Sequence, residues 1–354
     1  MGMHAGISYM MEALTYLGIK ANHISFEQRM NKSVLSCANS EEAKHFAEAS
    51  RLTYKRLDEA LHPDETALHS LFGFFPGMPD GHPYGYNIAN LVCSDAANQL
   101  LGYEEQKALI RRYNKKDLAK AALTSLGIFS NDMEDSFDFF NLIDKLSISQ
   151  EDKFRIMTVC TNPDEYMDKV FEQLDEVVNA LQSFEGEVMP FIEEYCARSA
   201  MKSITTKLNA DIGFALPEDA KIEVIPYLLN PGIVAVMAND DNEYTVHIGM
   251  LYLSRFIGNP RLSDDEMLEM LKSISDPSRL EILRCLGGGE MYGREIAKQI
   301  GLYFTTVSHH MAKLMNCRLV RCRLAGNKAY YSIDEDGAKQ FVNSICEMLK
   351  TKPD

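Results

Sequence analysis

A glycine between two short helical patterns is the feature that most constrains how this chain can fold. Gly301 ends the apolar-periodic segment 294–300, and a second such segment, 305–314, follows it closely. Glycine accepts the left-handed backbone conformation that a tight exit from a helix demands. Two helices joined by such a turn form a helix-turn-helix, whose second helix enters the major groove of DNA. The sequence therefore predicts a DNA-binding unit near this end of the chain.

The neighbouring segments complete the predicted unit. Before the helix pair, Ser263 and Glu266 form a capping box, and Asp276-Pro277 begins a further helix. After the pair, apolar and basic residues alternate over 320–333 around a turn at 326–328, which predicts a β-hairpin. An amphipathic helix follows the hairpin. This order of helices and hairpin is that of a winged helix domain.

The second helix of the pair indicates which side chains would face DNA. Val307, Met311 and Leu314 share one face, and we expect them to be buried. The opposite face carries short hydroxyl side chains and an imidazole, which can reach base edges and phosphates. In the hairpin, Arg321 and Arg323 alternate with apolar residues, so we expect both guanidinium groups on its open face.

Charge is unevenly distributed along the chain. The whole sequence has a net charge of −15, but residues 261–354 contain 14 Lys and Arg against 13 Asp and Glu, a balance of +1. The remaining residues hold 22 basic and 38 acidic side chains, a balance of −16. Positive charge is thus concentrated where a duplex would bind, and the acidic remainder would repel DNA from its own surface.

The length of 354 residues is that of a two-domain protein. Residues 1–215 are mostly helical by periodicity, with one helix from Ser40 to Leu61, another from Asn162 and a further one from Glu185 to Leu208. The segment 221–253 changes to β-branched and aromatic runs, which predicts an antiparallel meander of about three strands.

We place the domain boundary at the break Ile257-Gly-Asn-Pro260. The expected fold is therefore mainly α with a small β component. An acidic, mostly helical domain over 1–260 would carry sensing, partner binding or dimerisation. A winged helix DNA-binding domain would occupy 261–354.

Several function classes are not expected from the sequence. No apolar run reaches the roughly 18 residues of a membrane span, and the first residues lack the basic flank of a signal peptide, so we expect a cytoplasmic protein. Eight cysteines include no Cys-x-x-Cys pair, which argues against a disulfide framework or a zinc finger. Motifs for nucleophilic catalysis, phosphate binding or zinc proteolysis do not occur, so we expect neither an enzyme nor a cofactor.

Two histidine groups invite a metal-site interpretation, and a simpler one is favoured for each. Adjacent helical residues point about 100° apart, so His309 and His310 are poorly placed for joint ligation, and DNA contact for the first with packing for the second is expected. The other group surrounds the Gly/Pro-rich loop 73–85, where solvated histidines are the favoured alternative: His62, Glu65, His69 and His82. Aromatic residues in the same region are expected in the core, with a ligand pocket as the alternative: Phe72, Phe74, Phe75, Tyr84 and Tyr86.

Residues 262–350 resemble the ArsR family of winged helix repressors. The resemblance is carried, in order, by Asp276-Pro-Ser-Arg-Leu-Glu-Ile-Leu, Arg294-Glu-Ile-Ala, Thr306-Val-Ser-His-His-Met and Tyr330-Tyr-Ser. It implies a homodimer clamped by the first and last helices of the unit, with the fourth helix in the major groove and the hairpin as a wing. Carried over residue by residue, it assigns DNA contact to Phe304, Thr305, Thr306, Ser308 and His309, and in the wing to Arg321, Arg323, Asn327 and Lys328.

The chain also departs from the metal-sensing and redox-sensing members of that family. Glu290-Met-Tyr-Gly-Arg-Glu-Ile296 has no thiol where metal sensors have a Cys-Val-Cys pattern, and 334–350 has no histidine. We therefore expect no metal site in this unit. Cys285 and Cys346 lie on the helices where sulfur-sensing members keep a cysteine pair, but Cys285 is one position later in its motif. Ordinary buried cysteines are favoured, with a thiol-based redox-sensing repressor as the alternative.

The sequence as a whole predicts a transcriptional regulator that binds double-stranded DNA, most simply a dimeric repressor reading a pseudo-palindromic operator. The first domain would sense a small-molecule effector or a partner. One alternative makes 1–260 an enzyme with an autoregulatory DNA-binding tail, and another makes it a protein-interaction module without a ligand.

Overall fold

The computed structural model describes residues 2–35, 41–75, 87–97, 101–125, 139–144, 146, 148–198, 214–215, 220–238, 243–252, 262, 264–325 and 328–351. The chain divides into two compact units. The first comprises residues 1–199 and 221–256, and the second comprises 200–220 and 257–354. None of the described helices combines the length and the apolar content needed to cross a membrane.

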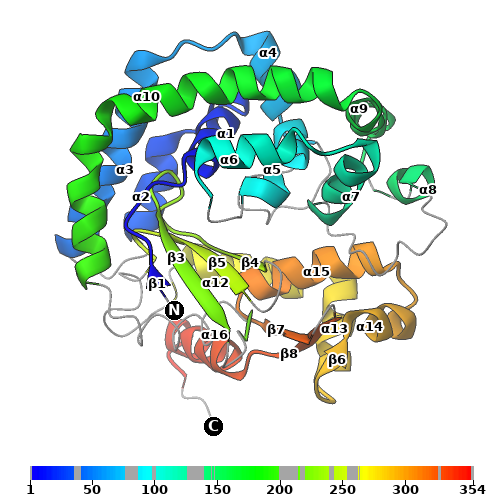
Figure 1. Cartoon of the computed structure of the whole chain (residues 1–354). Helices are drawn as coiled ribbons and strands as arrows, with labels where there is room; N and C mark the ends of the chain where they lie inside the picture. The colour runs from blue at the N-terminus through cyan, green and yellow to red at the C-terminus, as the bar shows by residue number, and fades with distance from the viewer. Residues whose placement is uncertain are drawn as a thin grey trace. The chain divides into compact units, whose positions relative to one another are not determined.

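Helices make up most of the first unit (Figure 1). They are α1 (Tyr9–Ala21), α2 (Phe26–Leu35), α3 (Glu41–Ala60), α4 (Glu65–Phe72), α5 (Ile88–Ala97), α6 (Tyr103–Ile110), α7 (Lys115–Ser125), α8 (Phe139–Asp144), α9 (Gln150–Thr161) and α10 (Pro163–Arg198). Helix α1 is central, because apolar residues line it all round and nearly all of it is buried. It contacts α4, α5 and α10.

Helix α10 begins at Pro163, directly after Asn162, where the sequence predicts a helix to start, and it has an apolar stripe. Val170, Leu174, Val177, Val178 and Leu181 are all buried. The second helix expected from Glu185 does not begin there, because α10 continues without interruption to Arg198. Figure 1 shows it bending as it wraps the unit, and a proline inside the helix, Pro190, removes one backbone hydrogen bond.

The sheet of the first unit corrects the expected meander. Strands β3 (Lys221–Tyr227), β4 (Val234–Ala238) and β5 (Glu243–Gly249) form, with β1 (Gly2–Met3), a sheet of order β1-β3-β5-β4. Three strands occur where three were predicted, but β3 pairs with β5 in parallel, and only β4 and β5 are antiparallel.

The turn after β3 explains the unexpected strand order. Asn230-Pro-Gly does turn the chain, but it passes across the end of β5 instead of closing a hairpin. Leu251 N donates to Pro231 O at 2.8 Å, and Gly249 N donates to Ile233 O at 2.7 Å. Strand β5 is thereby placed centrally, and six of its seven residues are buried, as in strands covered on both faces.

The second unit has the winged helix order predicted from the sequence. Its elements are α12 (Asp264–Ile274), α13 (Pro277–Leu286), β6 (Met291–Tyr292), α14 (Gly293–Ile300), α15 (Phe304–Asn316), β7 (Val320–Ala325), β8 (Lys328–Ile333) and α16 (Glu335–Met348). The sequence did not indicate β6, nor β2 (Phe214–Ala215), which pairs in parallel with β7. The resulting sheet has the order β2-β7-β8-β6.

One core holds these helices and the hairpin together. Its fully buried members include Ile282 of α13, Ile296 of α14 and Val320 of β7. The predicted start of α13 at Asp276-Pro277 is confirmed, and Asp276 caps the helix because its Oδ1 accepts a hydrogen bond from Arg279 N at 3.0 Å. The predicted capping serine of α12, Ser263, lies outside the described residues.

Candidate nucleic-acid interface

The turn between α14 and α15 has the backbone geometry predicted for it. Gly301 is left-handed, with φ 70° and ψ 25°. The amide of Leu302 donates to Ala297 O at 3.1 Å and closes the end of α14. Val307, Met311 and Leu314 are each 0% exposed, as predicted, so α15 is packed down by one face. The opposite face is the surface that a winged helix offers to the major groove.

The start of α15 has no side-chain cap. Tyr303 occupies the N-cap position, makes no side-chain cap hydrogen bond and is 71% exposed. Phe304 is half-buried and lies close to Gly293, where a Cβ would come within 2.9 Å of its ring. A glycine at 293 therefore lets the first turn of α15 approach α14 closely.

The remaining predicted readers of α15 lie along its partly open face. Thr306, Ser308 and His309 are each half-buried. Thr305 lies at the second position of the helix, and its side chain lies outside the described part of the structure. The helix thus places these positions together at its N-terminal half, and their contact with DNA stays a prediction.

Both histidines of α15 favour the neutral form. Burial lowers the pKa of His309, and the neighbouring His310 and Lys313 lower it further. Burial also lowers the pKa of His310, although Asp276 opposes this effect from 3.9 Å away. A neutral imidazole at position 309 can both donate and accept a hydrogen bond at a base edge. Among the described residues, no group of three or more His, Cys, Asp or Glu side chains is placed to bind a metal.

The two arginines of the wing differ in environment, although the sequence treats them alike. Arg321 is 29% exposed, and its Nη2 donates to Oδ1 of the fully buried Asp334 at 2.9 Å. Arg323 is 45% exposed and contacts Glu290, with Nε donating to Oε2 at 3.0 Å. Its guanidinium also lies 5.1 Å from the ring centroid of Tyr330.

The wing therefore has one inward and one outward guanidinium. The pair with Arg323 holds the pKa of Glu290 below its usual range. Because Glu290 is itself at the surface, a phosphate can replace it as the partner of Arg323 at small cost. Asn327 lies outside the described residues, and Lys328 begins β8 with a side chain that is likewise not described.

Sequence reasoning missed three partners of the wing: Glu290, Tyr330 and Asp334. Glu290 and Tyr330 come together because the unpredicted strand β6 pairs with β8, with Tyr292 opposite Tyr330. Asp334 could have been found from its position before the last helix, since Asp is a preferred N-cap residue. Its Oδ1 does accept from Gly337 N at 3.0 Å.

The two cysteines for which redox sensing was the alternative interpretation are both free thiols. Cys285 of α13 and Cys346 of α16 are half-buried. None of the cysteines that the structure describes forms a disulfide bond. The redox-sensing alternative stays a prediction for these two thiols.

The helix pair, the left-handed glycine and the hairpin define a winged helix-turn-helix. Comparison with known proteins agrees: residues 276–321 match the model of the arsR family of bacterial regulatory proteins. The regulator KmtR of Mycobacterium tuberculosis is 34% identical over 88 residues, which are 24% of this chain and 68% of the relative. The arsenical resistance operon repressor of Staphylococcus xylosus is 34% identical over 90 residues, 25% of this chain and 86% of the relative. The chain belongs to the arsR family, and it is a DNA-binding transcriptional regulator.

Further relatives cover a similar share of the chain. The transcriptional repressor SdpR of Bacillus subtilis is 31% identical over 83 residues, 23% of this chain and 92% of the relative. Among solved structures, NolR of Sinorhizobium fredii is 27% identical and covers 26% of this chain and 97% of its own, with a TM-score of 0.21. A homodimeric winged helix-turn-helix DNA-binding domain of Mycobacterium bovis is 30% identical and covers 25% and 87%, with a TM-score of 0.21.

Proposed function

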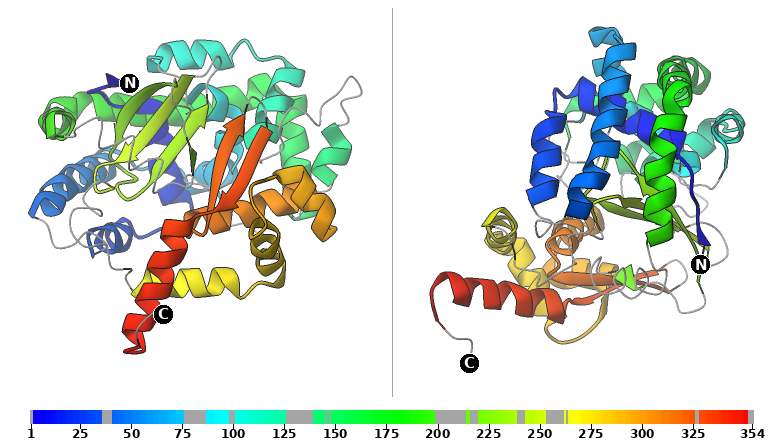
Figure 2. Two further views of the ribbon diagram at one scale, coloured as in Figure 1. Left: turned by 90° about the horizontal axis from the view of Figure 1, so that it is seen from below. Right: turned by 90° about the vertical axis from the view of Figure 1, so that its left-hand side faces the viewer.

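We propose that this regulator is a cytoplasmic, dimeric repressor whose two winged helices read a pseudo-palindromic operator. The observation that carries the proposal is a group of exposed apolar side chains on α12 and α16, which we take as one apolar face. The two helices pack against each other (Figure 2). Leu268 and Leu271 of α12 are 49% and 38% exposed, and Val342 of α16 is 50% exposed. Met348 and Leu349 extend the face at 53% and 62%.

Such a face supports association with a second copy. Contiguous exposed apolar side chains mark interaction surfaces in soluble proteins, and most oligomers are two-fold dimers in which the same patch meets itself. A two-fold axis through α12 and α16 would present two copies of α15 to one side of a duplex. Half-sites would then lie roughly one helical turn apart, about 34–36 Å.

We propose repression rather than activation on the basis of two relatives. The Staphylococcus xylosus and Bacillus subtilis relatives are named as repressors. A dimer seated on an operator blocks polymerase without further machinery, so DNA binding alone suffices for this function.

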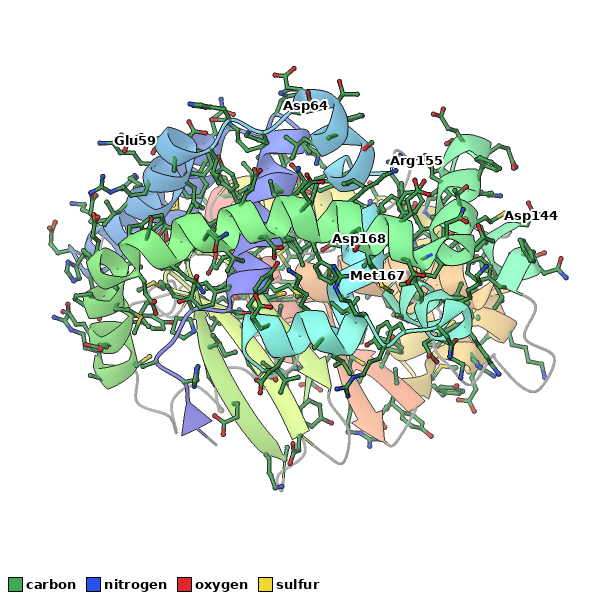
Figure 3. All side chains as sticks on the ribbon, turned by 45° about the horizontal axis from the view of Figure 1, so that its top comes forward. Glu59, Asp64, Asp144, Arg155, Met167 and Asp168 are labelled. Atoms are coloured by element: carbon green, nitrogen blue, oxygen red, sulfur yellow. The ribbon has the colours of Figure 1, made fainter. Side chains whose placement is uncertain are left out.

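We further propose that the first unit senses a small molecule rather than catalysing a reaction. A cleft of about 710 Å³ lies between the end of α1, the connection from α3 to α4, and α4. Figure 3 labels Glu59 and Asp64, which bracket that connection. The volume falls in the range of small-molecule sites, and the lining combines apolar side chains such as Ile24 and Leu61 with polar groups.

The polar groups of the cleft favour binding over chemistry. Lys20 Nζ is already held by Asp58 at 2.6 Å, and His69 Nδ1 lies 3.3 Å from Ala21 O. A ligand bound here regulates DNA binding only if it prefers one dimer geometry over another. A thermal-shift screen of the full chain against metabolites tests this role. A His62→Ala variant with an unchanged shift for every ligand found would contradict a binding role for this side chain.

The DNA-reading role is tested with a duplex selected by the wild-type chain from a randomised library. We expect His309→Ala and Ser308→Ala each to weaken binding to the selected duplex by about 5- to 150-fold, since a lost base contact costs about 1–3 kcal/mol. Binding to a scrambled duplex should change little. A matched control is Ser344→Ala, a half-buried hydroxyl on α16. Equal loss on both duplexes would show that α15 does not read sequence.

A further inference from the structure

Asp334 joins the wing to the last helix through a buried carboxylate. Its side chain is 0% exposed, and Oδ1 accepts hydrogen bonds from Arg321 Nη2 at 2.9 Å and from Gly337 N at 3.0 Å. Its own backbone amide donates to Leu319 O at 3.0 Å, one residue before β7. Asp334 therefore caps α16, binds the side chain of Arg321 in β7 and anchors the backbone that leads into β7.

Close packing surrounds this junction. Gly337, in the first turn of α16, lies so near the chain that a Cβ there would come within 1.8 Å of Arg318 O. Arg318 has a positive φ of 55°, and its Nη1 donates to Gln340 Oε1 of α16 at 3.0 Å. The turn from α15 into β7 is thus pressed directly against the start of α16, with little room to change its angle.

We infer that Arg321 positions the wing relative to the last helix and does not contact DNA phosphate. The inference deepens the proposed function, since it rests on α16 forming part of the dimer face. If α16 is fixed at the two-fold axis, then the angle between α16 and β7 sets where the wing meets the duplex. The Arg321–Asp334 ion pair determines that angle from the wing side.

The cost of releasing Arg321 argues for this assignment. Moving its guanidinium to a phosphate would leave the fully buried Asp334 carboxylate without its charged partner, and an uncompensated buried charge is strongly destabilising. Arg323, two residues along the same strand, has an exposed partner and can exchange it for phosphate. The two arginines of β7 therefore have different roles: Arg321 positions the wing, and Arg323 binds DNA.

The test compares neutral variants of the full chain on one 30-base-pair duplex across a range of salt concentrations. Arg323→Gln should reduce the log–log salt slope by about 0.9, the value for one lost phosphate contact. Arg321→Gln should weaken binding and lower the melting temperature. The double variant Arg321→Gln/Asp334→Asn, which removes both charges of the ion pair and keeps an N-cap side chain, should recover the wild-type affinity and salt slope.

The opposite assignment gives different results. If Arg321 binds phosphate, the double variant keeps a slope reduced by about 0.9, and Asp334→Asn alone tightens DNA binding because it releases the arginine. Either result overturns the inference. Should Arg321→Gln fail to fold, Asp334→Asn decides alone, since positioning predicts several-fold weaker binding. A wild-type chain that binds no duplex, or stays monomeric in sedimentation, would instead contradict the proposed function.

Discussion

At the scale of single residues, the most unusual group in the first unit is a buried carboxyl on its central helix. Glu12 of α1 is 0% exposed, and its two oxygens accept hydrogen bonds from Leu228 N at 2.7 Å and Leu229 N at 2.9 Å. Burial raises the pKa of Glu12 to about 8, against the opposing effect of these two hydrogen bonds. The carboxyl therefore fastens the turn after β3 to α1 while preferring its protonated form.

This shift predicts a pH dependence of stability with a definite sign. The pKa of Glu12 is higher in the folded chain than the ordinary 4.5, so the folded state binds the extra proton and stability falls as pH rises towards 8. Between pH 6.5 and 8 the loss should be about 2 kcal/mol. Glu12→Gln should lack this slope, and urea unfolding at several pH values measures it. The exposed Glu48→Gln is the control, and parallel curves for wild type and Glu12→Gln would refute the shift.

A second buried group, His247, has a pKa shift in the opposite direction to that of Glu12, and the pH range from 6.5 to 8 lies above its titration. His247 of β5 is 1% exposed, and neither ring nitrogen has a hydrogen-bond partner within the described part of the chain. Burial lowers its pKa to about 4. Because this imidazole stays neutral when folded, its contribution to stability is complete above pH 6.5 and is lost as pH falls towards 4. Above pH 6.5, only Glu12 of the two produces a slope.

At the scale of elements, the turn between α14 and α15 depends on the backbone of one residue. Gly301 has φ 70°, and apart from its two chain neighbours no atom of the described residues lies within 4 Å of where its Cβ would be. Gly301→Ala should therefore destabilise the second unit by about 1 kcal/mol through backbone strain alone. Gly301→Asn should cost less, because Asn tolerates the left-handed region. Urea unfolding of the two variants measures the difference.

A stabilising Gly301→Ala would contradict that backbone geometry. Alanine stabilises a protein by about 0.4–1 kcal/mol where the native backbone suits it, so the sign of the change separates the two cases. The salt slope of DNA binding should remain that of the wild type in both variants, since neither removes a charge.

The elements also show where sequence reasoning succeeds. The second unit was predictable because its signals are local. Helices α13, α14 and α15 all have helical periodicity, α13 begins at a proline and ends before Gly287, and α14 ends before Gly301. The strand order of the first unit was not predictable from the sequence. The turn at 230–232 is a local signal, but the pairing of β3 with β5 depends on packing against α1, which is distant in the sequence. Arg321 was assigned to the open face from alternation alone, and the nearby Asp334 carboxylate depends on how α16 folds back.

At the scale of the whole molecule, known relatives indicate the function of the second unit but not that of the first. Within the second unit, residues 276–321 match a family model, and the relatives of known class cover about a quarter of the chain. The first unit carries most of the acidic excess of a chain with net charge −15. That excess disfavours non-specific attachment of the first unit to DNA, which leaves binding to the winged helix.

Assembly is the property of the whole molecule that the proposed function needs most. The wild-type chain of 40.0 kDa should sediment as a dimer. Val342→Lys places a charge at the α16 face in both copies, where burial of an unpaired charge costs several kcal/mol, so dimer affinity should fall by about 100-fold or more. Operator affinity should fall with it, because each half-site would then be bound by a separate chain.

The matched control is Phe154→Lys, which changes an equally apolar and even more exposed side chain, 69% exposed, on α9 of the first unit. It should leave both the mass and the operator affinity unchanged. If Phe154→Lys rather than Val342→Lys dissociates the dimer, the interface lies on the first unit. In that case the distance between the two copies of α15 is set by the first unit, and a ligand in its cleft could change that distance without acting through α16.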